Sequence, residues 1–552
     1  MLAAVRGVLA GWTPLGDEAL TGLSSYDVFS GRLPIMGPRT TTAFETGIES
    51  HHPGPLLYYL LAPTSALAGG APWGLIVGSL AITVALIAVG VHAAHRVGGP
   101  LLAAGAGAAF LGVQWALGPD AGARPFNPYP PAFATLTFFV LTWALLEEHL
   151  QYVPHQVVVV SVMLQGHIGY LPFLALPVMV LVLTGLVRWG MRRRTLWPLQ
   201  GWRPADHGRH RRTAWAAVGL AVLLWIPPGV ELFTYSPNNL QQILAYVSAD
   251  RGDPVATSDV LRFIVGMLAP VPGGLQPALT GFGHVGAHLS QQTTSTTAVL
   301  VGSVLLLLTV AIALLRWRAL RLAVPDRLRF FLPARIESCG ALVALLALAA
   351  AGLTMTRLPA SSARSSWNYL QAWPVAFVVL LVLVTYATRR VLPLLSRSRW
   401  PVCRTAIGAL LLSGLLAAWT SPVKSRWHEG DGVAAGADAL RTRLTAIAQE
   451  HEGTLHVTFD ADTLGAGYYV APALAHLVKD DYAIHLPAVW SAAEDTDFRK
   501  SVTSPADTAW VSIRDGGPRR STSVDQRSTA VTTVSDGSGN VYTLYVRGPD
   551  ST

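Results

Sequence analysis

The stretch IGYLPFLALPVMVLVLTGLVRWGMRRR, residues 168–194, decides the fold class of this chain. Twenty residues without a charge, Ile168–Val187, are followed by Arg188 and then by three consecutive arginines. A membrane-spanning helix needs about 20 apolar residues, and arginines beside such a run mark the cytoplasmic side. The stretch therefore predicts a membrane helix that ends in the cytoplasm.

The composition of the whole chain is that of a membrane protein. Of its 552 residues, 51% are hydrophobic and 13% are charged, whereas soluble domains carry about 25% charged residues. The net charge of +8 comes from arginines in short segments between apolar runs, which signals membrane orientation. We therefore expect membrane lipid, and no nucleic acid, as a partner. Cys339 and Cys403 lack metal-binding spacing and are predicted to be free thiols on the reducing side.

Apolar runs recur along the chain and predict a polytopic α-helical membrane protein with about 10–12 membrane helices, some of them partial. The runs are 56–68, 73–94, 101–118, 131–146, 155–165 continuing into 168–187, 214–228, 298–315, 339–355, 372–386 and 402–419. Three arginine-rich segments are predicted to be cytoplasmic, namely 188–212, 316–335 and 389–404. The segments that then fall outside are 13–53, 118–130, 229–297, 357–371 and everything after 420.

This topology requires two irregular segments. The short run 56–68 must enter the membrane without crossing it, and the tract 155–187 must enter and return. That tract is too long for one helix and too short for two spans, so a broken helix is predicted around Gln165-Gly166-His167. The apolar stretch 1–12 would be about 18 Å long as a helix, which is too short to cross. We expect the natural chain to begin upstream of it, unless the N-terminus simply starts outside.

The composition changes after about residue 421, where apolar runs shorten to strand length. Strands are predicted at 455–459 and 482–486, in AWVSI, and in TAVTTV and VYTLYV around a SDGSGN turn, with a helix at 467–479. We therefore predict a transmembrane domain over 1–420, with extracytoplasmic loops at 13–54 and 229–297. An extracytoplasmic α/β domain is predicted over 421–552.

Polar residues gather in the segments that this topology places outside. The first outer loop contains Asp17 and Glu18 in GDEALTG, and it ends in HHPGPLLYYL, whose prolines fix His51 and His52 at the membrane surface. The same loop contributes Tyr26, Asp27 and Arg39 as further site candidates. Candidates from later segments are Asn127 and Tyr129 in FNPYPP, Gln165 and His167 in the broken tract, and Arg364. We expect one cavity at the outer interface to collect these groups.

These residue types fit the transfer of a sugar that is carried on a lipid phosphate. A carboxylate would take the proton of the acceptor hydroxyl, and we assign this role to Asp17, with Glu18 as a neighbour in role or a structural partner. Cations or donors would stabilise the leaving phosphate, and protonated histidine or arginine suits that task. Arg39 and Arg364 are candidates for it, although each can instead form a structural ion pair.

The acids and histidines of the first loop also have ordinary structural interpretations. Asp17 can begin a helix or be a solvated loop acid, and Asp27 fits a turn or a cap. His51 and His52 can be polar residues of the membrane interface. No complete set of metal ligands is evident, so the sequence leaves a divalent cation open as a cofactor.

The later candidates have competing roles as well. Gln165 and His167 can hydrogen-bond a kink at Gly166, although polar groups at membrane depth are often functional. Asn127 and Tyr129 lie among prolines, so loop rigidity explains them as well as substrate binding does.

The layout resembles the GT-C superfamily of integral-membrane glycosyltransferases. The matching features are GDEALTG after the first apolar segment, HHPGPLLYYL, NPYPP in a later outer loop, and the C-terminal α/β domain. The resemblance implies a first-loop acid as catalytic base, a polyprenyl-phosphate sugar as donor, and a cell-envelope glycan, lipid or protein as acceptor. It further implies an inverting enzyme of the bacterial plasma membrane whose site faces outward. The chain departs from the pattern in lacking a full first helix.

Two other functions remain open at this stage. A transporter or flippase of lipid-linked glycans should contain paired halves or repeated broken helices, whereas this sequence has one broken tract and no evident repeat. A non-catalytic envelope-assembly protein would tolerate the loss of Asp17.

Overall fold

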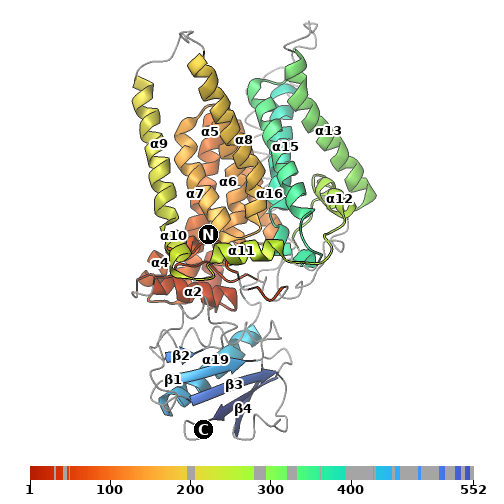
Figure 1. The fold of residues 1–552 in the computed structure, drawn as a ribbon. Coiled ribbons are helices and arrows are strands. Elements are labelled where there is room, and N and C mark those ends of the chain that lie inside the picture. The colour runs from red at the N-terminus through yellow and green to blue at the C-terminus, as the bar shows by residue number, and fades with distance from the viewer. Residues whose placement is uncertain are drawn as a thin grey trace.

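A computed structural model describes the chain as a bundle of long helices with a small mixed sheet beyond one end (Figure 1). The described residues are 1–29, 33–40, 46–48, 50–194, 205–278, 294–319, 332–360, 362–364, 366–391, 427 and 431–450, together with the five strands given below. Within them, six helices are long and apolar enough to cross a membrane, or seven if one bent pair counts as a span. The chain is therefore a mostly helical, multi-pass membrane protein.

Helix α5 (Pro72–Leu117) is two antiparallel membrane helices rather than one. Its backbone reverses at Gly99, where φ is 73°, a conformation that glycine adopts without steric cost. Gly90 lies against the ring of Phe110, which a straight helix would place about 30 Å away. Both predicted runs, 73–94 and 101–118, are thus present, and the reversal lies just beyond the HAAHR segment.

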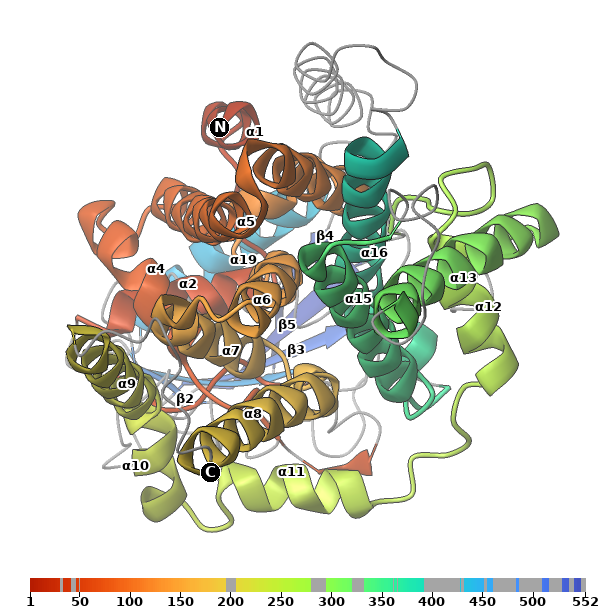
Figure 2. The same ribbon diagram turned by 90° about the horizontal axis from the view of Figure 1, so that it is seen from above.

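The other helices that pass the length and hydropathy criteria lie to one side of this hairpin, and α6 and α16 pack against it (Figure 2). They are α6 (Tyr129–Leu146), α8 (Tyr170–Arg194), α13 (Thr296–Ala319), α15 (Arg335–Met355) and α16 (Ala372–Tyr386). Helix α6 is buried along most of its length and contacts α5, α7, α15 and α16. Its rings, which include Phe133, Phe138 and Trp143, form the centre of the hydrophobic core.

The tract 155–187 forms the predicted hairpin. Helix α7 (Val153–Gly166) has 14 residues, about 21 Å, and is too short to span. The chain breaks at His167–Gly169, and α8 then returns and extends to Arg194. Helix α4 (Leu56–Leu67) has 12 residues, about 18 Å, and is also too short to cross. It packs against the first arm of α5, with Gly74 and Gly78 beside its last turns.

The described parts of the segments predicted to be cytoplasmic lie at one end of the bundle, and those of the segments predicted to be outside lie at the other (Figure 1). The end where α8 stops, α13 stops and α15 begins is called the arginine end below. The other end, called the α2 end, carries α1 (Leu2–Leu9), α2 (Asp17–Asp27), α4, α10 (Ile226–Thr234) and α11 (Asn239–Ser248). Helix α9 (Ala205–Leu224) connects the two ends, and α12 (Thr257–Met267) packs against α13. The expected outer loops thus contain short helices.

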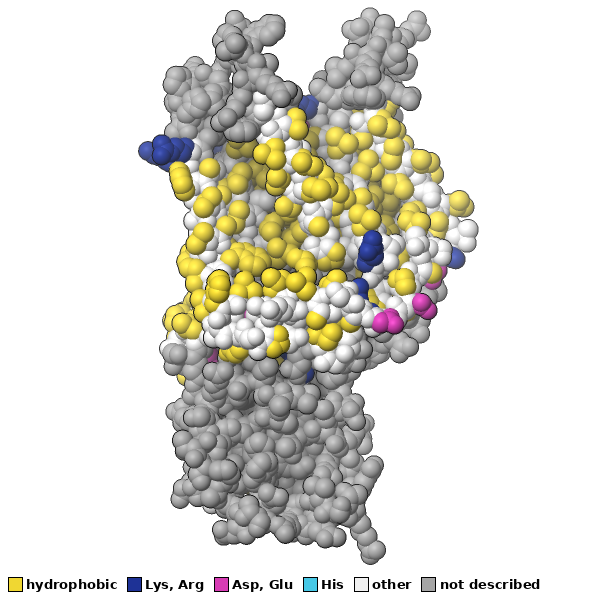
Figure 3. All heavy atoms as spheres, in the orientation of Figure 1, with side chains coloured by type: hydrophobic (Ala, Val, Ile, Leu, Met, Phe, Trp, Pro, Cys, Tyr) yellow, Lys and Arg dark blue, Asp and Glu magenta, His cyan; other side chains and the backbone are white. Residues whose placement is uncertain are grey.

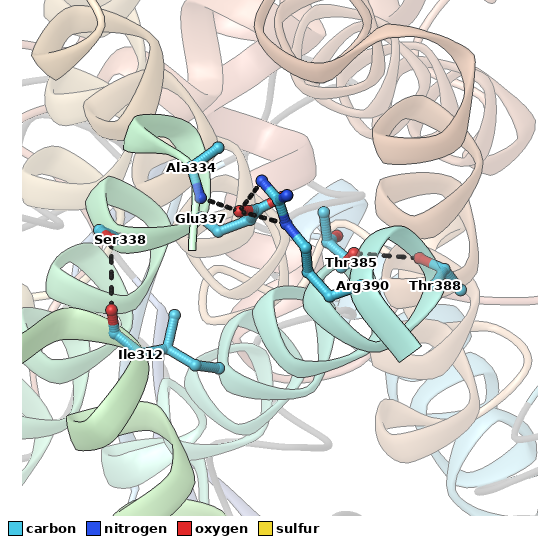
Figure 4. Close-up of polar contacts among 7 residues, drawn as sticks. All are labelled: Ile312, Ala334, Glu337, Ser338, Thr385, Thr388 and Arg390. Atoms are coloured by element: carbon cyan, nitrogen blue, oxygen red, sulfur yellow. Dashed lines mark hydrogen bonds and ion pairs between the residues drawn. The ribbon is translucent and has the colours of Figure 1, made fainter. Parts of the chain in front are cut away.

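The arginine end is tied together by ionic contacts (Figure 4). Glu337 in the first turn of α15 accepts hydrogen bonds from the Ala334 backbone N–H and from Arg390, whose Nη2 is 3.1 Å from Glu337 Oε2. Arg390 belongs to η7 (Ala387–Val391), the π-helical turn that continues α16. The neighbouring Arg389 bonds to the carbonyl of Gly98 at the α5 reversal. One cluster therefore joins α5, α15 and α16.

Helix α19 (Asp431–Glu450) and five strands lie beyond the α2 end (Figure 1). The strands are β1 (Thr454–Phe459), β2 (Ala483–His485), β3 (Ala509–Asp515), β4 (Thr529–Ser535) and β5 (Val541–Arg547). The sheet order is β2-β1-β3-β5-β4, parallel from β2 to β3 and antiparallel beyond. Each predicted strand segment overlaps one of these strands. The predicted helix 467–479, the run 402–419 and Cys403 lie outside the described residues. Cys339 forms no disulfide with another described residue.

Candidate active site

The GDEALTG stretch begins helix α2 rather than forming a loop. Gly16 precedes the helix with φ 50°, and Asp17 and Glu18 occupy its first turn. Carboxylates are favoured there because the helix dipole places partial positive charge at the N-terminus. The two side chains differ, since Asp17 is exposed and Glu18 is buried.

Glu18 is committed to an ion pair with Arg124. Arg124 Nε and Nη2 each lie 2.7 Å from a Glu18 carboxylate oxygen, so the guanidinium holds both oxygens. Arg124 follows η1 (Ala121–Ala123) in the segment 118–130, and its side chain is almost as buried as that of Glu18. Of the two roles that the sequence left open for Glu18, this geometry fits the structural partner. Sequence reasoning missed Arg124.

Asp17 keeps an exposed carboxylate beside this ion pair. The surrounding protein desolvates it and, with the Glu18 carboxylate as the second cause, raises its pKa to about 6. Exposure and desolvation occur together when a side chain is open on one side and enclosed by protein on the others. A carboxylate with a pKa near the working pH is suited to accept a proton from a hydroxyl.

The HHPGP stretch is held as a short extended segment against residues 38–40. Thr40 N donates to Ser50 O at 3.0 Å and His52 N donates to Pro38 O at 2.8 Å, which places Arg39 opposite His51. His51 Nδ1 donates to the Gly37 carbonyl at 3.2 Å. Burial lowers the pKa of His51 to about 4, and Arg39 adds to this effect.

His52 and His167 form a pair of buried imidazoles in two distant segments. Their ring centroids are 4.9 Å apart. His52 Nδ1 accepts from the Ile168 N–H at 2.9 Å, and His167 Nδ1 accepts from the Gly169 N–H at 3.1 Å. Both rings therefore carry their hydrogen on Nε2. Burial, together with the neighbouring His167 and His51, lowers the pKa of His52 well below its ordinary value. His52 is thus a neutral donor, which differs from the protonated histidine that the sequence led us to expect.

Gln165, at the C-terminal end of α7, links this helix to the segments at Leu56 and Leu224. Its Oε1 accepts from the Leu56 N–H at 3.2 Å, and its Nε2 donates to the Leu224 carbonyl at 2.9 Å. A side chain at Gly54 would collide with the Gln165 amide, so glycine permits the close approach. Gln165 therefore positions the start of α4 and the end of α9.

The FNPYPP segment contacts the same break, and the turn 366–369 contacts the FNPYPP segment. Asn127 Nδ2 donates to the Gly166 carbonyl at 3.4 Å. Asn127 Oδ1 is buried, and it has no hydrogen-bond partner among the described residues. Phe126 contacts Tyr129, at a ring separation of 5.2 Å, and Trp367, at 6.3 Å. The turn 366–369 therefore joins this cluster through an aromatic contact.

Most of the predicted site residues converge at the α2 end. His51, His52, Arg39, Gln165, His167 and Asn127 lie in directly contacting segments. Asp17 and Glu18 join them through Arg124, whose Cα is at most about 11 Å along the chain from that of Asn127. Tyr26 and Asp27 lie at the other end of α2 from Asp17, about 15 Å along the helix. The side chain of Arg364 lies outside the described residues.

Two further residues of this cluster were not predicted. Asn239 begins α11 and bonds to the backbone of His51, and Glu231 on α10 accepts from the Asn239 N–H at 2.7 Å. Both lie in the segment 229–297, which shows no pattern that links it to HHPGP. Among the described residues there is no group of three His, Cys, Asp or Glu side chains arranged to hold a metal ion. The described part of the chain thus offers no ligand set for the divalent cation that the sequence left open.

The helices and this polar cluster define the class as a multi-pass membrane protein with a polar site at one end of the bundle. No family model and no curated protein matches the chain. Among solved structures, it is similar to ArnT from Cupriavidus metallidurans bound to undecaprenyl phosphate, with a TM-score of 0.49, 13% identity, and coverage of 100% of this chain and 97% of that chain. For ArnT in the apo state the TM-score is 0.41, the identity 14%, and the coverage 100% and 98%.

Both matches are thus to one protein, ArnT, in two states. At TM-scores below 0.5, neither match identifies the site, the substrate or the reaction of this chain.

Proposed function

We propose that the chain is an inverting GT-C-type glycosyltransferase. It moves a sugar from a polyprenyl-phosphate donor to a cell-envelope acceptor hydroxyl at the outer face of the bacterial plasma membrane. The observation that carries the proposal is the exposed Asp17, with a pKa of about 6, at the end of the bundle where buried histidine donors gather. An open base and hydrogen-bond donors beside a lipid-embedded bundle are what a lipid-phosphate sugar donor requires.

The proposed reaction is a single displacement at the anomeric carbon. Asp17 takes the proton of the acceptor hydroxyl as its oxygen forms the new bond to the anomeric carbon. The bond from that carbon to the phosphate oxygen breaks on the opposite face, which inverts the configuration. The electron pair leaves with the phosphate, so the products are the glycoside and a polyprenyl phosphate.

The leaving phosphate gains negative charge as this bond breaks. The Nε2–H groups of His52 and His167 are the donors that we assign to its oxygens, and Arg39 beside His51 supplies positive charge. Neutral imidazoles donate without a fixed charge, so the phosphate is not held so tightly that release of the product is slow. We further propose that the α2 end faces outward and that residues 421–552 cover the site or hold the acceptor.

The test is Asp17→Asn, with Asp259→Asn as the matched control. Asp259 is also an exposed acid in the first turn of a helix, α12. Purified protein in lipid nanodiscs is given a panel of polyprenyl-phosphate monosaccharides and an envelope extract, and release of polyprenyl phosphate is measured. We expect Asp17→Asn to lower turnover by about 10²–10⁴-fold with normal insertion, because only the proton acceptor is lost. Asp259→Asn should match the wild type.

The pH dependence is a second readout for the same role. Asp17 must be ionised to accept a proton, so turnover should fall about tenfold per pH unit below pH 6 and be level above it. Full activity of Asp17→Asn would contradict its role as the base. Movement of the intact donor across the bilayer, without release of polyprenyl phosphate, would favour the transporter.

A further inference from the structure

Asn239 connects helix α11 to the backbone of the histidine segment. Its Oδ1 accepts from the His51 N–H at 2.8 Å, and its Nδ2 donates to the His51 carbonyl at 3.1 Å and to the His52 carbonyl at 3.5 Å. Asn239 is itself buried, and its backbone N–H donates to Glu231. One side-chain amide thus pairs with the backbone of His51 as a neighbouring strand would.

The extended segment 50–52 needs such a partner. On one edge, residues 38–40 take the hydrogen bonds of Ser50 and His52. In an antiparallel pair, the residue between two such bonds directs its own N–H and C=O to the opposite edge. For His51 that edge is occupied by Asn239. Because His51 is buried, removing the amide would leave a backbone donor and acceptor without partners.

The contact reaches the His52 ring through the backbone. His52 shares a peptide unit with His51. The hydrogen bond from the Ile168 N–H to His52 Nδ1 fixes the orientation of the ring, so that the Nε2–H points away from Ile168. A shift of the 51–52 backbone would rotate the ring away from both Ile168 and His167. Asn239 therefore acts on the donor atom without touching a ligand.

Helix α11 lies across the bundle axis, below α8 in Figure 1 and at the edge of the bundle beside α8 in Figure 2. One of its faces, Asn239, Ile243 and Tyr246, is buried against the protein. The adjacent face exposes Leu240, Leu244 and Val247, and the band of apolar side chains on the bundle continues down to this level (Figure 3). A short helix with an apolar face beside a membrane bundle lies in the interface between lipid and water.

We propose that Asn239 is a positioning residue, carried on an interfacial helix, that holds His51 and His52 so that the His52 Nε2–H faces the donor phosphate. This inference rests on the proposed function for the identity of the ligand. The position of residues 238–248 in the lipid interface would thereby affect the orientation of the His52 ring at the phosphate site.

The test compares Asn239→Ala with Asn238→Ala in lipid nanodiscs. Asn238 is the adjacent residue, and it caps α11 through reciprocal bonds with Gln241, each 2.9 Å long. Its loss weakens the same helix without removing the contact to His51. A third variant, Asn239→Asp, keeps the acceptor for the His51 N–H and loses the donor to the two carbonyls.

Two measurements are made on each variant. The first is the dissociation constant for undecaprenyl phosphate, which should rise about tenfold in Asn239→Ala, less in Asn239→Asp and less than about twofold in Asn238→Ala. The second is amide hydrogen exchange of His51 and Ile168, which requires no ligand. Both amides should exchange at least about tenfold faster in Asn239→Ala than in the wild type and in Asn238→Ala.

The outcomes separate this inference from the proposed function. If the wild type binds undecaprenyl phosphate and Asn239→Ala binds it equally well, the positioning role is wrong and the donor class stands. If the wild type does not bind it while exchange accelerates as expected, the donor class is wrong and the backbone role stands. If the two amides exchange equally fast in Asn239→Ala and in Asn238→Ala, the positioning role is overturned, whether or not the protein binds undecaprenyl phosphate.

Discussion

Two buried glutamates, one at each end of the bundle, are paired with arginine in different ways. Glu18 at the α2 end is held by Arg124 through both carboxylate oxygens at 2.7 Å. Glu337 at the arginine end uses one oxygen, Oε2, for the Ala334 N–H and for Arg390 at 3.1 and 3.3 Å. Its Oε1 is buried and has no partner among the described residues.

The two buried glutamate–arginine ion pairs therefore have different roles. Glu337 closes the start of α15 and ties it to the end of α16, so it stabilises the packing of membrane helices. Both carboxylate oxygens of Glu18 are held by Arg124, whereas the adjacent Asp17 is open to solvent. At the arginine end the charges are used within the fold, whereas at the α2 end one acid is left available.

The largest expected effect is that of Arg124→Ala. It would leave the Glu18 carboxylate buried without its partner, and such losses cost about 3–5 kcal/mol of unfolding free energy. Denaturant unfolding in detergent measures this. The double variant Glu18→Leu with Arg124→Met removes both charges and should recover most of the loss. Wild-type stability of Arg124→Ala would mean that the pair does not hold α2.

A smaller loss is expected for Arg390→Ala. The side chain of Arg390 is 24% exposed and its bonds to Glu337 are longer, while the Ala334 N–H would remain. We expect about 1–3 kcal/mol, measured by the same unfolding experiment. An effect equal to that of Arg124→Ala would remove the distinction between the two ends.

The smallest effect is expected for Arg335→Ala, which removes the ion pairs to Glu147 and Glu148 at 3.4 Å. The Arg335 side chain is 54% exposed, so water and salt screen its charge. Exposed pairs are worth about 0–1 kcal/mol. Unfolding midpoints of the variant and the wild type at low and high salt measure this contribution. A loss above about 2 kcal/mol would show that the exposure of an ion pair does not determine how much it stabilises the protein.

The spans were predictable because hydropathy is a local property of the sequence. The run predicted at 372–386 has the bounds of α16, and the run 131–146 differs from α6 by two residues at its start. The break at Gln165-Gly166-His167 was also predictable, since the tract 155–187 fits neither one span nor two. Helix α2 was missed because its polar and small residues show no apolar period.

The site was only partly predictable, because its decisive contacts join residues far apart in the sequence. HHPGP and the His167 break were identified as polar groups beside membrane segments, and the two rings do meet. Arg124 was passed over as one arginine in a loop, although its partner lies 106 residues away. Asn239 pairs with a backbone 188 residues away, and a bond to backbone leaves no signature in either segment.

The segment around Trp427 has a consequence for biosynthesis. Gly7 of α1 lies against the Trp427 ring, and Trp12 contacts the same ring at 5.5 Å, so the first helix is covered by a residue made more than 400 positions later. At roughly 5–20 residues per second, the ribosome needs at least about 20 s to supply that ring. Helix α1 is therefore synthesised at least about 20 s before the residue that covers it.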